Sequence, residues 1–255
     1  METIEILRDD RGLVTLTLNR PHRKNAIDSV MWEELRTTLR EISANPQDRA
    51  LVITGADGAF CSGQDLGDSS GRPPYFAMKQ VADVAISLHR MAKPVIAKVD
   101  GIAAGAGLNL ALGCDLIVAS DRSRFSEIFV RRGLTIDFGG SWLLPRLIGL
   151  HRAKQLALLG DVISAAEAAE LGLVNRVVPV DELDAAVEDW AARLVAGPPI
   201  ALGSAKELLN QSFDMTFEQA LDAEGLAQAV NFGTADTREA ISAFLDKREP
   251  RFEGR

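Results

Sequence analysis

One carboxylate in the chain has surroundings that suit proton-transfer chemistry. Asp137 lies between the apolar side chains of Ile136 and Phe138. If this segment is buried, loss of water would raise the pKa of the carboxyl group and suit it to exchange a proton near neutral pH. The residue could instead cap a helix or be a solvated loop acid, although Ser141 offers a second capping side chain. Asp137 is therefore a candidate acid/base.

Two glycine-containing segments could present free peptide N–H groups to a ligand. In residues 59–66, Gly63 permits backbone angles that would turn the N–H groups around Gln64 into a cleft, although an ordinary turn is the alternative. Residues 101–109 place small side chains where a strand should give way to a helix, and free N–H groups at a helix start favour negative charge. Tight helix packing is the alternative there. Leu110 replaces the third Gly or Ala of a dinucleotide fingerprint, and no Gly-Lys-Ser/Thr of a P-loop follows.

The other reactive residue types are expected to be structural. His22, His89 and His151 have no metal-ligand spacing and no neighbouring nucleophile. Cys61 and Cys114 lie far apart, form no Cys-x-x-Cys motif and fit a reducing compartment. The sequence therefore predicts no metal site.

Composition and hydropathy indicate a globular protein and limit its partners. The 255 residues include 36 acidic and 28 basic side chains, which gives a net charge of −8, and 47% of the residues are hydrophobic. These values are typical of a globular protein, and a pI near 5.0 argues against a nucleic-acid partner. The N-terminus lacks the pattern of a signal peptide, and the longest mostly apolar run, residues 101–114, is too short to cross a bilayer. We expect a cytoplasmic protein with no membrane partner.

Hydrophobic periodicity predicts alternating strands and helices through about residue 178. Such alternation is typical of an α/β fold. A helix after Asp28 should bury one stripe, formed by Met31, Leu35, Leu39 and Ile42. The expected strands are 3–7, 13–18, 50–54, 95–99, 116–119 and 173–178, with a buried helix over 101–113.

The last part of the chain is expected to be helical throughout. From residue 181 onward the pattern indicates helices, with breaks at 197–199 and near 233–234. We therefore divide the chain into a core with the ligand site, residues 1–180, and a helical region for assembly, residues 181–255. Its apolar side chains need a covering surface, because large exposed apolar patches usually mark interfaces.

Five ordered motifs together resemble the enoyl-CoA hydratase/isomerase, or crotonase, superfamily. The motifs span essentially the whole chain: Asn19-Arg20-Pro21 with Lys24-Asn25-Ala26, residues 60–66, residues 101–109, residues 138–146 and residues 172–178. The resemblance implies a spiral core of repeated ββα units, a C-terminal helical region, and a homotrimer or a dimer of trimers. It also implies an acyl-CoA thioester substrate.

The resemblance assigns roles to individual residues. The backbone N–H groups of Gln64 and Ala106 match the oxyanion hole that polarises the thioester carbonyl. Positions that match the substrate and CoA site are Lys24, Ala26, Ser62, Asp65, Leu66, Gly105 and Asn109. Coenzyme A belongs to the substrate, so no separate cofactor is expected.

The chain departs from the hydratase pattern at both of its glutamate positions. These hold Asn109 and Phe129 here, and Glu127 lies two residues away from the second. Asp137 occupies the position at which isomerases of the superfamily place their acid/base. We therefore expect an isomerase that shifts a double bond or opens a ring, with two alternatives: a hydratase that uses Asp137 or Glu127, and a silent acyl-CoA-binding subunit. The walls of the acyl pocket are expected in the loop 67–75 and in helices that the sequence cannot position.

Overall fold

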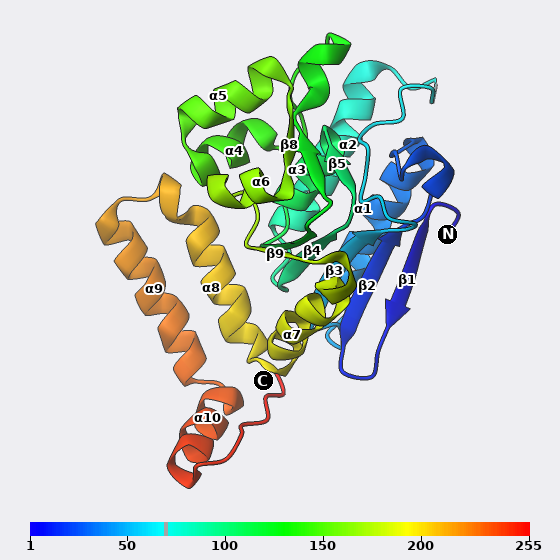
Figure 1. Cartoon of the computed structure of the whole chain (residues 1–255). Coiled ribbons are helices and arrows are strands. Elements are labelled where there is room, and N and C mark those ends of the chain that lie inside the picture. Colours follow the sequence, from blue (N-terminus) through cyan, green and yellow to red (C-terminus); the bar gives the residue numbers. More distant parts are fainter. Residues whose placement is uncertain (69–70) are drawn as a thin grey trace.

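The computed structural model describes residues 1–68 and 71–255, and its core is built on two sheets (Figure 1). In the main sheet β1 pairs with β2 in antiparallel fashion, and every further pair is parallel. Its strands, in spatial order, are β1 (Ile4–Arg8), β2 (Leu13–Leu18), β3 (Ala50–Gly55), β4 (Val95–Val99), β6 (Leu116–Ser120) and β9 (Arg176–Val178). The second sheet contains β5 (Ile102–Ala104), β7 (Arg124–Ser126) and β8 (Val162–Ser164).

Helices follow most of the strands. They are α1 (Ser29–Ala44), α2 (Pro74–His89), α3 (Ala106–Leu112), α4 (Gly140–Ile148), α5 (Leu150–Leu159), α6 (Ala165–Leu171), α7 (Leu183–Ala196), α8 (Pro199–Gln211), α9 (Phe217–Phe232) and α10 (Ala235–Asp246). Short 3-10 turns are η1 (Pro21–Arg23), η2 (Ile128–Arg132), η3 (Val180–Glu182) and η4 (Ser212–Asp214). No helix in the described part of the chain is long and apolar enough to cross a membrane.

The two faces of the main sheet bury different sets of residues. The larger cluster includes the apolar stripe of α1, and all four predicted side chains of that stripe are fully buried. Asp28 caps this helix, because its side chain accepts a hydrogen bond from the N–H of Met31. The smaller cluster places α7 against β3, β4 and β6, so α7 covers the other face of the sheet although it lies beyond residue 180.

The predicted strands over 3–7 and 13–18 are confirmed, and they pair as an antiparallel hairpin with Ile6 opposite Leu16. The helix expected over 101–113 is wrong at its start, since residues 102–104 form β5 and the helix begins at Ala106. Gly105 separates the two with φ 54° and ψ −127°, angles that a residue with a Cβ rarely adopts. The predicted strand over 173–178 is also shorter, because β9 begins at Arg176.

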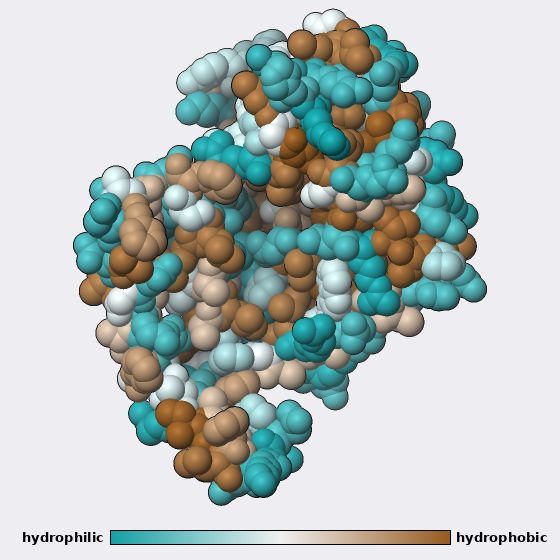
Figure 2. All heavy atoms as spheres, turned by 60° about the vertical axis from the view of Figure 1, so that its left-hand side comes forward, coloured by the Kyte–Doolittle hydropathy of each residue, from teal (hydrophilic) through white to brown (hydrophobic). Residues whose placement is uncertain are grey.

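The last three helices, α8 to α10, extend away from the sheets (Figure 1). The predicted breaks near 197–199 and 233–234 are present. A further break at 212–216 was missed, where η4 ends and Thr216 caps α9 through a capping box with Gln219. Apolar side chains gather on the exposed surface of these helices (Figure 2), and Phe217, Leu226 and Phe244 are 73–83% exposed.

Candidate active site

The two segments that were expected to supply N–H donors run side by side. The N–H of Cys61 donates to the carbonyl of Ile102, and the N–H of Ala104 donates back to the carbonyl of Cys61, each at 2.9 Å. Two residues further along each segment, an ideal Cβ on Gly63 would lie only 3.6 Å from the nitrogen of Ala106. The segment from residue 61 therefore passes directly beside the start of α3.

Both candidate donors, the N–H groups of Gln64 and Ala106, are left without a hydrogen-bond acceptor within the described residues. Ile27 pairs with the neighbours of Gln64: its N–H donates to Gly63 at 2.8 Å, and its carbonyl accepts from Asp65 at 2.9 Å. This pairing turns the N–H of Gln64 to the opposite side. Ala106 is the first residue of α3, so its N–H has no acceptor within the helix. Two such donors from adjacent segments fit an oxygen that carries developing negative charge.

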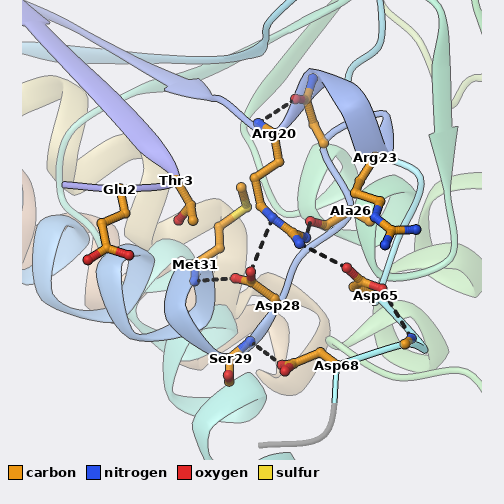
Figure 3. Close-up of polar contacts among 12 residues, drawn as sticks. Glu2, Thr3, Arg20, Arg23, Ala26, Asp28, Ser29, Met31, Asp65 and Asp68 are labelled. Carbon is orange, nitrogen blue, oxygen red and sulfur yellow. Dashed lines mark hydrogen bonds and ion pairs between the residues drawn. The ribbon is translucent and has the colours of Figure 1, made fainter.

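An arginine holds the first donor segment in place (Figure 3). Arg20 contacts Asp28 through Nε at 3.1 Å and Asp65 through Nη2 at 2.9 Å, and its Nη1 donates to the carbonyl of Ala26. Partial burial raises the pKa of Asp65, but the hydrogen bonds from Arg20 and from the N–H of Gly67 outweigh it and lower that pKa below its ordinary value. Asp65, expected in the substrate site, therefore fixes the loop that carries Gln64.

Trp32 joins the donor segment to the candidate acid. Its indole Nε1 donates to the side-chain oxygen of Gln64 at 2.6 Å, and its ring stacks on Phe138 with centroids 5.7 Å apart. Phe138 follows Asp137 directly and adopts a left-handed conformation with φ 50°. Trp32 was not among the expected site residues, because its apolar ring is typical of a core position.

Three polar side chains share the space beside α3. Asn109 is fully buried, and its Nδ2 donates to the main-chain carbonyl of Asp137 at 3.0 Å and, more weakly, to Oε2 of Glu127 at 3.5 Å. Gly140 makes this possible, because a Cβ there would lie within 2.6 Å of the Asn109 amide. Three buried side-chain oxygen atoms in the described part of the chain lack a protein hydrogen bond: Asn109 Oδ1, Glu127 Oε1 and Asp137 Oδ1.

Burial changes the ionisation of both carboxyl groups. It raises the pKa of Asp137 to about 6, which agrees with the expectation that this carboxylate loses solvation. Burial raises the pKa of Glu127 to about 8, and the charge of Asp137 adds to this, whereas the hydrogen bond from Asn109 opposes it. The two carboxyl groups therefore have different pKa values, as paired acids in active sites often do.

Glu127 was expected in the site only under the hydratase alternative, because it lies two residues from the hydratase glutamate position. The topology brings it beside Asn109. β7 runs parallel to β5, and Ala104 lies opposite Ser126, so the residues that follow both strands meet at the same edge. Glu127 therefore lies beside the start of α3. The parallel pairing of β5 with β7 could have indicated the position of Glu127. It was not foreseen, because residues 102–104 were predicted to be helical.

The remaining expected site residues occupy the neighbourhood of the donor segment. Lys24 is exposed in a left-handed conformation, and its carbonyl accepts from the N–H of Ser62 at 3.0 Å. Ala26 is buried, and Leu66 is 61% exposed. Cys61 is inert as a nucleophile, since burial raises the pKa of its thiol to about 12. No cluster of possible metal ligands occurs among the residues that the structure describes.

Two N–H groups without a protein acceptor and the carboxyl groups of Glu127 and Asp137 therefore lie together near the start of α3. Comparison with known proteins shows which family has this fold. The family model described as enoyl-CoA hydratase/isomerase matches residues 8–255. A 1,2-epoxyphenylacetyl-CoA isomerase of Escherichia coli is 39% identical, over 96% of this chain and 97% of its own. A probable enoyl-CoA hydratase of Rhodobacter capsulatus is 38% identical, over 96% and 95%.

Solved structures agree with the curated relatives. An enoyl-CoA hydratase from Bacillus anthracis superposes with a TM-score of 0.95 at 32% identity, and each chain is covered completely. A putative enoyl-CoA hydratase from Streptomyces coelicolor superposes with a TM-score of 0.94 at 34% identity, over 100% of this chain and 95% of its own. The chain belongs to the enoyl-CoA hydratase/isomerase family and is an enzyme of the crotonase superfamily with its α/β fold.

The arginine network generates a prediction about stability. Replacing Arg20 with Ala leaves Asp28 and Asp65 without their shared counter-charge in a site where all three side chains are at most 16% exposed. We expect a loss of about 3 kcal/mol in the free energy of unfolding, measured by urea denaturation. Arg11→Ala is the matched control, because its ion pairs with Asp9 and Glu188 are exposed and their loss should cost clearly less stability. Equal losses in the two variants would contradict the stabilising role of the Arg20 network.

Proposed function

We propose that this enzyme is an acyl-CoA isomerase in which Asp137 moves the proton. The observation that carries the proposal is the carboxylate itself: it is half-buried, its pKa is raised to about 6, and its buried Oδ1 lacks a protein partner. A group with these properties is ionised at neutral pH and free to accept a proton from a bound substrate.

The reaction would proceed through an enolate of the thioester. The thioester oxygen accepts hydrogen bonds from the N–H groups of Gln64 and Ala106, and Asp137 takes a proton from a carbon of the acyl chain. The electron pair then moves onto that oxygen, where each donor stabilises the negative charge by about 3 kcal/mol. Asp137 returns its proton to a different carbon, so the double bond shifts without gain or loss of atoms.

The positions that hold glutamates in hydratases support isomerisation over hydration. Asn109 cannot accept a proton, and its amide is engaged by the main chain of Asp137. Phe129 is buried and apolar. Names alone do not decide the question, because the relatives include both an isomerase and hydratases.

A hydratase is the second candidate, and Glu127 is the observation that favours it. This residue supplies a second carboxyl group beside Asp137, and activation of water commonly uses two. The two reactions differ in their products, since hydration adds water to the acyl chain and isomerisation does not. A silent binding subunit would give neither product.

The CoA part of the substrate would lie against two neighbouring segments, one with Lys24 and one with Ser62, which are joined by the hydrogen bond from the N–H of Ser62 to the carbonyl of Lys24. Arg23 and Lys24 are both exposed. The protein carries a net charge of −8, which repels an anionic ligand at long range, so local cations must offset that repulsion near the CoA phosphates.

We also propose that the exposed helices α8 to α10 mediate assembly into a trimer or a dimer of trimers. The supporting observation is their apolar surface, to which Leu209, Phe213 and Phe232 contribute with exposed fractions of 65–71%. A surface of this kind rarely faces water in a monomer.

Asp137→Asn should lower kcat by about 10²–10⁴-fold and leave affinity for acyl-CoA close to wild type, since Asn is nearly isosteric but cannot carry the proton. The measurement is isomerisation of an enoyl-CoA that the wild type converts, followed by ultraviolet absorbance. Asp121→Asn is a matched control, because this aspartate is exposed. Wild-type turnover in Asp137→Asn would remove Asp137 from the mechanism.

Lys24→Glu should raise the Kd for acyl-CoA more at low salt than at high salt, because screening weakens the interaction with the phosphates. Isothermal titration at two salt concentrations measures this. Lys98→Glu makes the same charge change at a lysine that is paired with Asp184 of α7, and it should affect Kd little. Equal salt dependence in wild type and Lys24→Glu would place the phosphates elsewhere.

Sedimentation equilibrium at micromolar concentration should give three or six times the chain mass of 27.5 kDa. Phe244→Glu, at a side chain that is 83% exposed, should shift the population towards smaller species, because a charge would be buried in the interface. A monomer mass for the wild type would refute assembly.

A further inference from the structure

Glu127 is a buried carboxyl group that the proposed proton transfer does not use. It is 0% exposed, and it follows β7 at the sheet edge where α3 begins. A buried carboxylate without a cation is costly, and it either finds a partner or takes up a proton. Its protonation state and its partner must therefore be identified.

The orientation of the Asn109 amide next to Glu127 is fixed by its surroundings. The main-chain carbonyl of Asp137 can only accept a hydrogen bond, so the group 3.0 Å from it must be the NH2 end of the amide. That same nitrogen lies 3.5 Å from Oε2 of Glu127. One amide hydrogen is thus available to each of these two oxygens, and Oδ1 of Asn109 is left without a protein donor.

Two of the unpartnered buried atoms belong to the side chains of Asn109 and Glu127, which already meet through Nδ2 and Oε2. Asn109 Oδ1 and Glu127 Oε1 are both acceptors when Glu127 is ionised, and neither has a protein donor. If Oε1 carries a proton, it can donate to Oδ1, while Nδ2 donates to Oε2 in return. A carboxylic acid and a primary amide then form a reciprocal pair with two hydrogen bonds, and the second amide hydrogen remains on Asp137.

We propose that Glu127 is a positioning residue that stays neutral in the working enzyme and, as an acid–amide pair with Asn109, holds the main chain of Asp137 in place for proton transfer. The inference rests on the proposed function for its kinetic consequence, but the pairing itself does not. Glu127 keeps its proton throughout the reaction, and Asp137 alone exchanges one with the substrate.

Few charged groups of the described residues can act on Glu127. Within residues 1–68 and 71–255, Asp137, in the loop before α4, is the one whose charge shifts the pKa of Glu127. On η2, Arg131 pairs with Asp161 at the surface and Arg132 is exposed. The charged or titratable side chains of the other elements near it are exposed or engaged elsewhere: Arg124 on β7, His151, Arg152 and Lys154 on α5, and Arg146, which stacks on Trp142 of α4.

Ionisation of Glu127 would disrupt the arrangement in two ways. The carboxylate cannot donate to Asn109 Oδ1, so the reciprocal pair is lost. Its negative charge would also lie close to Asp137 and to the enolate, which both carry negative charge during the reaction. Since the pKa of Glu127 is raised to about 8, kcat should fall as the pH rises through that value.

The first arm of the test compares kcat against pH for wild type, Glu127→Gln and Glu127→Ala. Gln can form the same reciprocal pair with Asn109 and cannot ionise, so the alkaline fall of kcat, normalised to each enzyme's own maximum, should disappear. Glu127→Ala removes the pair and should lower kcat roughly tenfold at neutral pH, the equivalent of about one hydrogen bond, and Gln should recover most of this loss.

The second arm measures Tm against pH at fixed protein concentration and does not require turnover. A carboxyl group whose pKa rises from 4.5 to about 8 on folding stabilises the protein fully below pH 4.5 and loses that contribution as the pH approaches 8. Glu127→Gln lacks this loss. Its Tm relative to wild type should therefore rise by at least about 3 °C between pH 5 and pH 8.5.

The two arms separate the possible failures. A Tm difference that does not change with pH overturns the proposal, whatever the kinetics show. An alkaline fall of kcat that persists unchanged in Glu127→Gln also overturns it. A pH-dependent Tm difference in an enzyme that isomerises no enoyl-CoA supports the acid–amide pair and refutes the function proposed for Asp137.

Discussion

A short ladder of main-chain hydrogen bonds determines where the two free N–H groups lie. Cys61 exchanges bonds with Ile102 and Ala104, and two to three residues later the same two segments present Gln64 and Ala106. The ladder can end in this way because the chain turns at Gly105, whose angles a side chain would disfavour. Backbone donors held by such a ladder are pre-organised, so they need no rearrangement when charge develops on a bound oxygen.

The side chains around the donors join this ladder to Asp137, the candidate acid/base. Arg20 fixes the loop of Gln64 from one direction, and Trp32 links the Gln64 side chain to Phe138 from another. On the opposite side Asn109, one turn into α3, holds the carbonyl of Asp137. The donors and the carboxylate are therefore positioned by contacts that meet at α1, α3 and the start of α4, and relative movement of any of these would disturb both.

Much of this architecture follows from local pattern. The alternation of the first hairpin, the stripe of α1 with its Asp28 cap, and the capping box of Ser164 and Glu167 before α6 are encoded within a few residues of each other. Asp137 is likewise recognisable, because its apolar neighbours make desolvation foreseeable. The oxyanion role of Gln64 and Ala106 came from family resemblance, and their free N–H groups are consistent with it.

The features that the sequence did not reveal depend on contacts between distant segments. Arg20 meets Asp65 across 45 positions, and Asn109 meets Glu127 across 18. A pair of this kind produces no periodic pattern in the sequence, because the fold, and not the spacing along the chain, decides which residues meet. The same reason explains the error over 101–113: a run of small apolar residues fits a helix or a strand until the pairing of β5 with β7 decides.

The most direct test of the account is the mass and structure of the product formed from an enoyl-CoA substrate. The enzyme is incubated in turn with a panel of enoyl-CoA thioesters, and the products are separated and analysed by mass spectrometry and NMR. An isomerase that uses Asp137 should give a product of unchanged mass with a displaced double bond, because one carboxylate moves one proton between two carbons. A product that has gained one water would contradict it, since hydration would then be the chemistry of the site.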